Sequence, residues 1–197
     1  MKTPNIKQTI LAVLAAGSLA LNAGEAGIWK PASSDSRRTL TYSSTQTLLG
    51  APTPVAVEFQ CDPKSGNQVF GTLGFDLTIG KTSVLKAFPF DDFEGPDAKA
   101  SASVHAVLTR AGKPALTLKS QASGSVPDEN AFCFSVAELS KQKKSVPKSL
   151  LQALAEPGAE SLLITVSDPR DPKLALQVTV PVAGRQAEFQ ALISGLK

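Results

Sequence analysis

The stretch PVAVEFQC, Pro54 to Cys61, decides the fold because its apolar residues occupy every second position. One face carries Val55, Val57, Phe59 and Cys61, and the other carries Glu58 and Gln60. A period of two is typical of a half-buried strand. The stretch QVFGTLGFDLTI, residues 68–79, alternates in the same way after the turn-rich DPKSGN. The two stretches together predict a β-hairpin.

Further along the chain, the same alternation predicts two more hairpins and another strand. SASVHAVLTR (101–110) and ALTLKSQ (115–121) flank the turn AGKP, and SLLITVS (161–167) and LALQVTV (174–180) flank DPRDPK. Proline and glycine in these short connections are typical of turns. AFCFSV, residues 131–136, predicts one more short strand.

Helical spacing occurs in two places. In SVPKSLLQALAEPGA (145–159), Ser145 and Pro147 are start signals and the Pro157–Gly158 pair is a stop signal. GRQAEFQALISGL (184–196) places apolar residues on one helical face at Phe189, Leu192, Ile193 and Leu196. We therefore expect one mainly β domain over residues 24–197, an antiparallel β-sandwich or open barrel with two or three short α-helices, one at the C-terminus.

The N-terminal residues 1–23, MKTPNIKQTILAVLAAGSLALNA, have the layout of a secretory signal peptide. Lys2 and Lys7 precede an apolar run from Ile10 to Leu21, and small residues follow. The run is too short to span a bilayer, which takes about 20 apolar residues. We expect cleavage near Ala23 and a soluble mature protein that is periplasmic or secreted, with no membrane span after cleavage.

The charge of the chain excludes one class of partner. The formal net charge is +3, and loss of Lys2 and Lys7 leaves +1, because 3 − 2 = 1. A nucleic-acid-binding protein needs a clustered basic face. The only basic cluster, Lys141 to Lys144, is interpreted as the end of a helix. We therefore expect no nucleic-acid partner.

The chain has two cysteines, Cys61 and Cys133, both in the part expected to be exported. In an oxidising compartment two thiols most simply pair, so a Cys61–Cys133 disulfide is predicted. Two thiolates and the one histidine, His105, leave a structural zinc site short of ligands. No metal or other cofactor is expected.

The patterns that would indicate an enzyme do not fit. GFDLTIGKTS (74–83) has five residues between its glycines where a phosphate-binding loop needs four. His105 lies in a predicted strand and points away from the apolar face, and no GxSxG motif accompanies it. These observations favour a protein without catalytic residues.

The stretch FPFDDFEGPDA, Phe88 to Ala98, concentrates most of the chemistry of the chain. It contains the carboxylates Asp91, Asp92, Glu94 and Asp97 and the rings Phe88, Phe90 and Phe93. Burial of a ring is favourable by roughly 1.5–3 kcal/mol, whereas clustered acids are not buried without partners. We expect the rings to anchor the loop and the carboxylates to face outward. The alternatives are an ordinary turn, a partner or ligand contact, a cation site, or paired carboxylates in catalysis.

The order of features along the chain supports one resemblance. Trp29 lies near the expected mature N-terminus, a strand ends in EFQCD (58–62), and GRQAEFQALISGL follows paired strands. In this arrangement the chain resembles small exported proteobacterial β-rich proteins, including periplasmic accessory proteins of type VI secretion. It departs from them in the mid-chain position of Cys133 and in FPFDDFEGPDA.

The resemblance implies a non-catalytic binding or accessory protein of the cell envelope, with another envelope or secreted protein as its partner. The alternative is an inhibitor of an exogenous hydrolase, or a hydrolase that uses the carboxylates of the Asp91 to Asp97 loop. Exported inhibitors of lysozyme are also small β proteins, so fold class alone does not separate these functions.

Overall fold

The computed structural model describes residues 27–34, 37–62, 72–80, 86–95, 98–139 and 145–194. The predicted signal peptide, Asp97 and the lysine cluster at 141–144 lie outside these residues. The elements, in chain order, are β1 (Ile28–Ser33), β2 (Arg38–Leu48), β3 (Ala51–Asp62), β4 (Thr72–Gly80), the 3-10 helix η2 (Phe90–Phe93), β5 (Ala102–Arg110), β6 (Lys113–Asp128), β7 (Ala131–Leu139), α1 (Val146–Ala155), β8 (Ala159–Asp168), β9 (Asp171–Pro181) and α2 (Gln186–Ile193).

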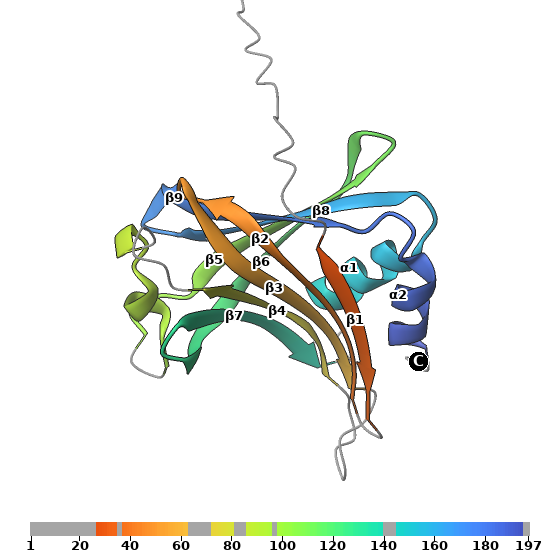
Figure 1. Ribbon diagram of the computed structural model, residues 1–197, viewed down its shortest axis with the longest axis horizontal. Coiled ribbons are helices and arrows are strands. Elements are labelled where there is room, and N and C mark those ends of the chain that lie inside the picture. The colour runs from red at the N-terminus through yellow and green to blue at the C-terminus, as the bar shows by residue number, and fades with distance from the viewer. Residues whose placement is uncertain are drawn as a thin grey trace, which may run out of the picture.

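The described residues form one antiparallel sheet of nine strands in the order β1-β2-β3-β4-β7-β6-β5-β8-β9 (Figure 1). The prediction of a mainly β, antiparallel fold with a C-terminal helix is confirmed. The three predicted hairpins are β3–β4, β5–β6 and β8–β9. In each pair the apolar face predicted from alternation is the buried face, so the register follows from the hydrophobic pattern.

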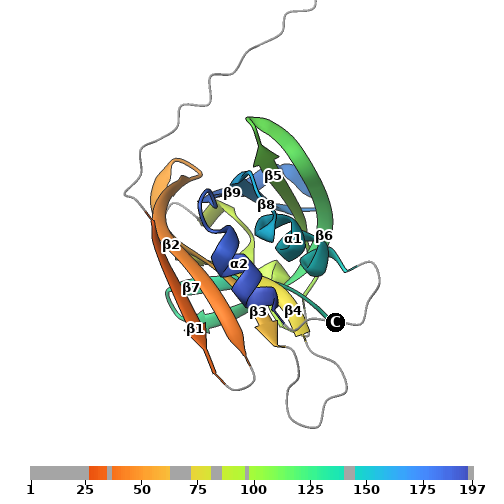
Figure 2. The same ribbon diagram turned by 90° about the vertical axis from the view of Figure 1, so that its right-hand side faces the viewer.

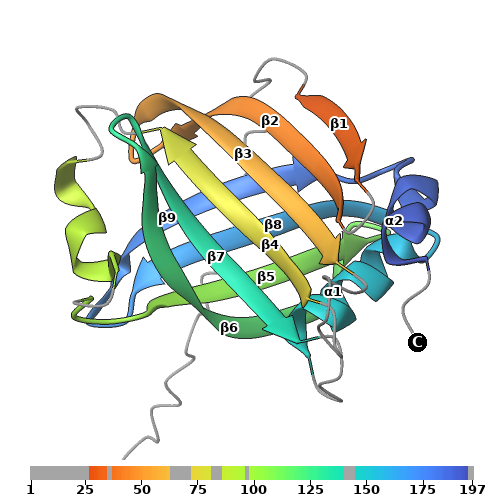
Figure 3. The same ribbon diagram turned by 90° about the horizontal axis from the view of Figure 1, so that it is seen from below.

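The long strand β6 joins the two halves of this sheet. Its first part, up to Ala122, pairs with β5, and its second part, from Ser123, pairs with β7. The strand therefore curves from one half of the sheet into the other (Figure 3). The apolar side chains of the core lie inside the curved sheet. Helix α1 contacts both β6 and β7, where these strands separate.

The buried apolar residues form one continuous core. At one end, α1 and α2 lie across the sheet, and Figure 2 looks onto this end. Trp29 packs there against Phe189 and Tyr42, with ring centroids 5.9 and 5.2 Å apart. At the opposite end, the segment that contains η2 covers the core (Figures 1 and 3).

Polar contacts fix both ends of α1 and the C-terminal end of α2. Ser145, the N-cap of α1, accepts a hydrogen bond from the Lys148 backbone N–H, as its sequence predicts. Arg110 of β5 donates to the carbonyl of Ala153 near the end of α1, at 2.6 Å. Arg38 of β2 does the same for α2, because it donates to the Ala191 carbonyl at 3.2 Å. Cations at these positions also complement the helix dipole.

A side chain of β2, the strand next to the β1 edge, reaches the β9 edge of the sheet. Within the described ranges, β9 pairs only with β8, so backbone bonds do not close the sheet. The Gln46 carboxamide of β2 reaches β9 instead. Its Nε2 donates to the Thr179 carbonyl at 2.7 Å, and its Oε1 accepts from the Thr179 N–H at 2.9 Å.

The predicted disulfide is wrong, and the strand register gives the reason. Cys61 and Cys133 are free thiols. Cys61 lies opposite Leu73 of β4, whereas Cys133 lies opposite Thr78 on the other side of β4. These positions differ by about 16 Å along the strand and about 10 Å across it, whereas bonded cysteines have Cα atoms within about 7 Å. The odd offset also places the thiols on opposite faces of the sheet.

Candidate functional site

The aromatic residues of FPFDDFEGPDA anchor this segment in the core. Phe88, Phe90 and Phe93 are buried. Phe90 packs against Phe132 of β7 with ring centroids 4.9 Å apart, and Phe93 lies 6.1 Å from Phe134. Such contacts between rings stabilise beyond the burial of apolar area. The backbone of the segment is therefore held by its rings.

A close backbone approach fixes the segment from the other side. Glu94 forms an isolated bridge to Gly124 of β6. A Cβ atom on Gly124 would lie 2.5 Å from the Phe93 carbonyl oxygen, so a larger residue does not fit without a shift. Glycine at this position allows η2 to lie directly on β6.

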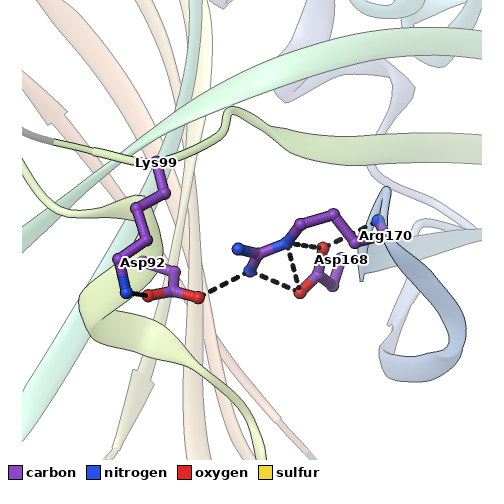
Figure 4. Close-up of polar contacts among 4 residues, drawn as sticks. All are labelled: Asp92, Lys99, Asp168 and Arg170. Atoms are coloured by element: carbon purple, nitrogen blue, oxygen red, sulfur yellow. Dashed lines mark hydrogen bonds and ion pairs between the residues drawn. The ribbon is translucent and has the colours of Figure 1, made fainter.

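Asp92 of η2 is held by two cations (Figure 4). One carboxylate oxygen accepts from Lys99 Nζ at 2.6 Å, and the other accepts from Arg170 Nη2 at 2.7 Å. Arg170, in the turn between β8 and β9, also pairs with Asp168 at 2.7 Å. The guanidinium lies over the Phe93 ring, 5.9 Å from its centroid. Arg170 thus joins η2 to the turn that follows β8.

The protonation of this network follows from its hydrogen bonds. Donation from Lys99 and Arg170 lowers the pKa of Asp92 below its ordinary value. Donation from Arg170 likewise lowers the pKa of Asp168, whose side chain is only 6% exposed. The two carboxylates in turn raise the pKa of Arg170. All three groups are charged at neutral pH.

The expectation that the loop carboxylates all face outward is not met by Asp92, because this carboxylate is neutralised within the chain. Asp91 and Glu94 are exposed, and Asp97 lies outside the described residues. No group of three or more metal-ligating side chains occurs among the described residues. The segment thus covers one end of the core with its buried rings and exposes two acids, Asp91 and Glu94.

A second pair of carboxylates lies on the outward face of the sheet. Glu58 of β3 is directly opposite Asp76 of β4. Arg37 donates to Glu58 at 2.5 Å, and Gln60 donates to Asp76 at 3.4 Å. Burial raises the pKa of Asp76, and the charge of Glu58 adds to this effect. The sequence analysis did not pair the two acids, although the alternation places Glu58 on the polar face of its strand and Asp76 on the polar face of the next one.

His105 and Cys133 do not form a catalytic arrangement in the described chain. His105 is exposed and lies between Lys119 of β6 and Thr165 of β8. Burial raises the pKa of the Cys133 thiol, and the charge of Asp76 raises it further. A thiol with a raised pKa is a weak nucleophile at neutral pH. These positions offer no general base with a nucleophile beside it.

A hollow of about 540 Å³ lies on the outward side of the sheet near Ile28. Its walls are formed by Ile28, Ser43, Ser44, Thr45, Pro54, Val55, Ala56, Thr78, Gly80, Asp128, Asn130 and Ala131. Most of these side chains are short, so the floor of the hollow is close to the backbone of β2, β3 and β4. Ile28 is 59% exposed at its rim.

Comparison with known proteins does not identify a family. No family model, curated protein or solved structure matches the chain. No helix in the described part of the chain is long and apolar enough to cross a membrane.

Proposed function

We propose that the protein is exported and acts as a non-catalytic binding or accessory protein of the cell envelope, with another envelope or secreted protein as its partner. The observation that carries this proposal is the open hollow next to Ile28, a partly apolar surface that the described part of the chain leaves uncovered. Exposed apolar surface with a polar surround favours protein contact. The relation to type VI secretion accessory proteins remains a prediction from sequence.

The interior of the sheet supports the same proposal. Buried side chains from every strand except β1 fill it as one core, and both ends are covered. Binding is therefore expected on the outside. We further propose that the sheet is an open barrel, with Gln46 at the seam between β2 and β9.

In-cell photo-crosslinking tests the proposed function. A benzoylphenylalanine at Thr45, in the hollow, is expected to give a discrete adduct with an envelope protein. The matched control places the same group at Thr117, an exposed threonine of β6 on the other half of the sheet. Equal adducts at both positions, or none at Thr45, would contradict the proposal.

Inhibition of an exogenous hydrolase is supported by a different observation, the exposed Asp91 and Glu94 on the anchored η2 segment. A rigid acidic projection suits a basic active-site cleft. If this function is correct, D91N/E94Q will lose inhibition of lysozyme that the unaltered protein shows, and high salt will have the same effect. The salt-bridged Asp92 does not support a hydrolase.

A further inference from the structure

The Gln46 side chain bonds to backbone groups at the edge of β9 in the way that a neighbouring strand would. A carboxamide has the same donor and acceptor as a peptide group. Both of its polar atoms bond to the backbone of one residue, Thr179, at 2.7 and 2.9 Å. The Thr179 N–H and carbonyl therefore point away from β8, towards the seam.

The hydrogen-bond pattern of antiparallel strands shows which other residues of β9 direct their backbone groups away from β8. In an antiparallel pair, every second residue directs both backbone groups away from its partner. Thr179, Gln177 and Ala175 share this parity, because the register with β8 is unbroken from Ser161 to Ser167. In the described chain, no other strand bonds to the outer groups of Gln177 or Ala175. The edge thus presents three N–H groups and three carbonyls, of which Gln46 occupies one pair.

The two edges of the sheet differ in their capacity to accept a strand. β1 has Pro31 in its middle, which lacks an N–H. The segment Leu174–Val180 of β9 contains no proline, and Pro181 comes only at its end. The outward residues Ala175, Gln177 and Thr179 are uncharged, whereas Leu176, Val178 and Val180 are buried.

We propose that the β9 edge is a strand-acceptor site that Gln46 blocks, and that its ligand is an extended polypeptide segment of a partner protein. The segment would pair with Ala175–Thr179 after displacing the Gln46 carboxamide, and backbone hydrogen bonds would supply its affinity. Alternating apolar residues would continue the buried face of β9. This inference rests on the proposed binding function and names a site separate from the hollow.

Peptide binding to the purified protein tests the site. The probes are fluorescein-labelled KTVTVTVTK and its proline analogue KTVTPTVTK, measured by fluorescence anisotropy. Q46A is expected to bind the first peptide at least tenfold more tightly than the unaltered protein, because the internal competitor is removed. The proline analogue should bind at least tenfold more weakly. Q177A, which removes an exposed glutamine side chain of β9 but keeps the backbone, should match the unaltered protein.

Several results would overturn the inference. Folded Q46A that binds no more tightly than the unaltered protein, or equal binding of the proline analogue, would exclude strand addition. Self-association of Q46A in sedimentation velocity without peptide binding would exclude the proposed partner class. If Q46A does not fold, Q46E replaces it, because a carboxylate keeps the acceptor for the Thr179 N–H but loses the donor. Its affinity should then rise by a smaller factor. A crosslink at Thr45 with failed peptide binding would refute this inference alone.

Discussion

At the helical end of the core, Arg38 and Arg110 donate to backbone carbonyls near the ends of α2 and α1, and Arg110 also pairs with the exposed Glu156. At the η2 end, Arg170 holds the covering segment by pairing with two carboxylates. A carbonyl does not titrate, whereas a carboxylate does. The carboxylates that pair with arginine at the helical end, Glu156 and Glu188, are 60% and 34% exposed, whereas Asp92 and Asp168 are 19% and 6% exposed. Ion pairs between exposed groups contribute little to stability. The η2 end is therefore expected to lose more stability in acid than the helical end.

The largest expected effect comes from removing a ring at either end. F93A and F189A each empty a fully packed site, since these side chains are 1% and 0% exposed. We expect each to lower the free energy of unfolding by about 3–5 kcal/mol, as for other buried phenylalanines. Urea denaturation measures this loss in the free energy of unfolding. The exposed T45A serves as control, and a loss below about 1 kcal/mol for F93A would show that η2 is not part of the cooperative core.

A smaller effect, specific to the η2 end, is expected from R170A. It leaves the buried Asp168 and the bridged Asp92 without their shared cation. Both carboxylates have a lowered pKa when folded, so their contribution is fully present above the unfolded value of about 3.9. It decreases as pH falls below that value and is lost once pH falls through the folded pKa. The difference in Tm between R170A and the unaltered protein should therefore be full at pH 7 and shrink below about pH 4. A difference that is constant with pH would contradict the ion-pair interpretation.

At the helical end, R110A should cost about 1 kcal/mol through the lost bond to the Ala153 carbonyl. Arg110 also pairs with Glu156 at 2.7 Å, but the Glu156 side chain is 60% exposed, so this ion pair contributes little. Neither the guanidinium nor the Ala153 carbonyl titrates near pH 4, so most of this loss should persist in acid. The measurement is the same pair of melting curves at pH 7 and pH 3.5. R110K, which keeps the charge, is expected to recover part of the loss. A loss that vanishes at pH 3.5 would remove the distinction between the ends.

The smallest effect is expected at the cysteines, one of which lies towards each end. Cys61 is opposite Arg38, and Cys133 stands between Phe132 and Phe134. C133S should change stability by less than about 1 kcal/mol, because no disulfide is lost. Labelling of the oxidised protein after unfolding should find two thiols. If the mass shows that neither cysteine is labelled, the predicted disulfide is present and the strand register is wrong.

Alternation predicted the strands whose two faces differ in polarity. It did not predict β1 and β2, since β2 carries Ser or Thr at both inward and outward positions, as in Ser43 and Ser44. The pairing of cysteines was wrong although the signal was present. Phe132 and Phe134 mark the inward face of β7, so Cys133 between them points outward, whereas Cys61 shares the inward face with Phe59.

In the segment Phe88 to Ala98, the sequence likewise predicted the burial of the rings but not the partner of Asp92. Burial of its rings follows from the cost of exposing them, and the structure buries all three. The partner of Asp92 is Arg170, 78 residues further along the chain. No local pattern links these positions, since they meet only because the β8–β9 turn lies beside η2 in the folded sheet.

The chain forms β5 and β6 between β4 and its partner β7, and this has a consequence for the order in which the chain folds. The first contact between β4 and β7, Gly80 with Ala131, closes a gap of 51 residues, because 131 − 80 = 51. Contacts of such separation form late, after local hairpins. We expect pulse-labelled hydrogen exchange to protect β5–β6 and β8–β9 before the amides shared by β4 and β7. If the protein is exported as proposed, β4 would stay unpaired along one edge until β7 has followed it across the membrane.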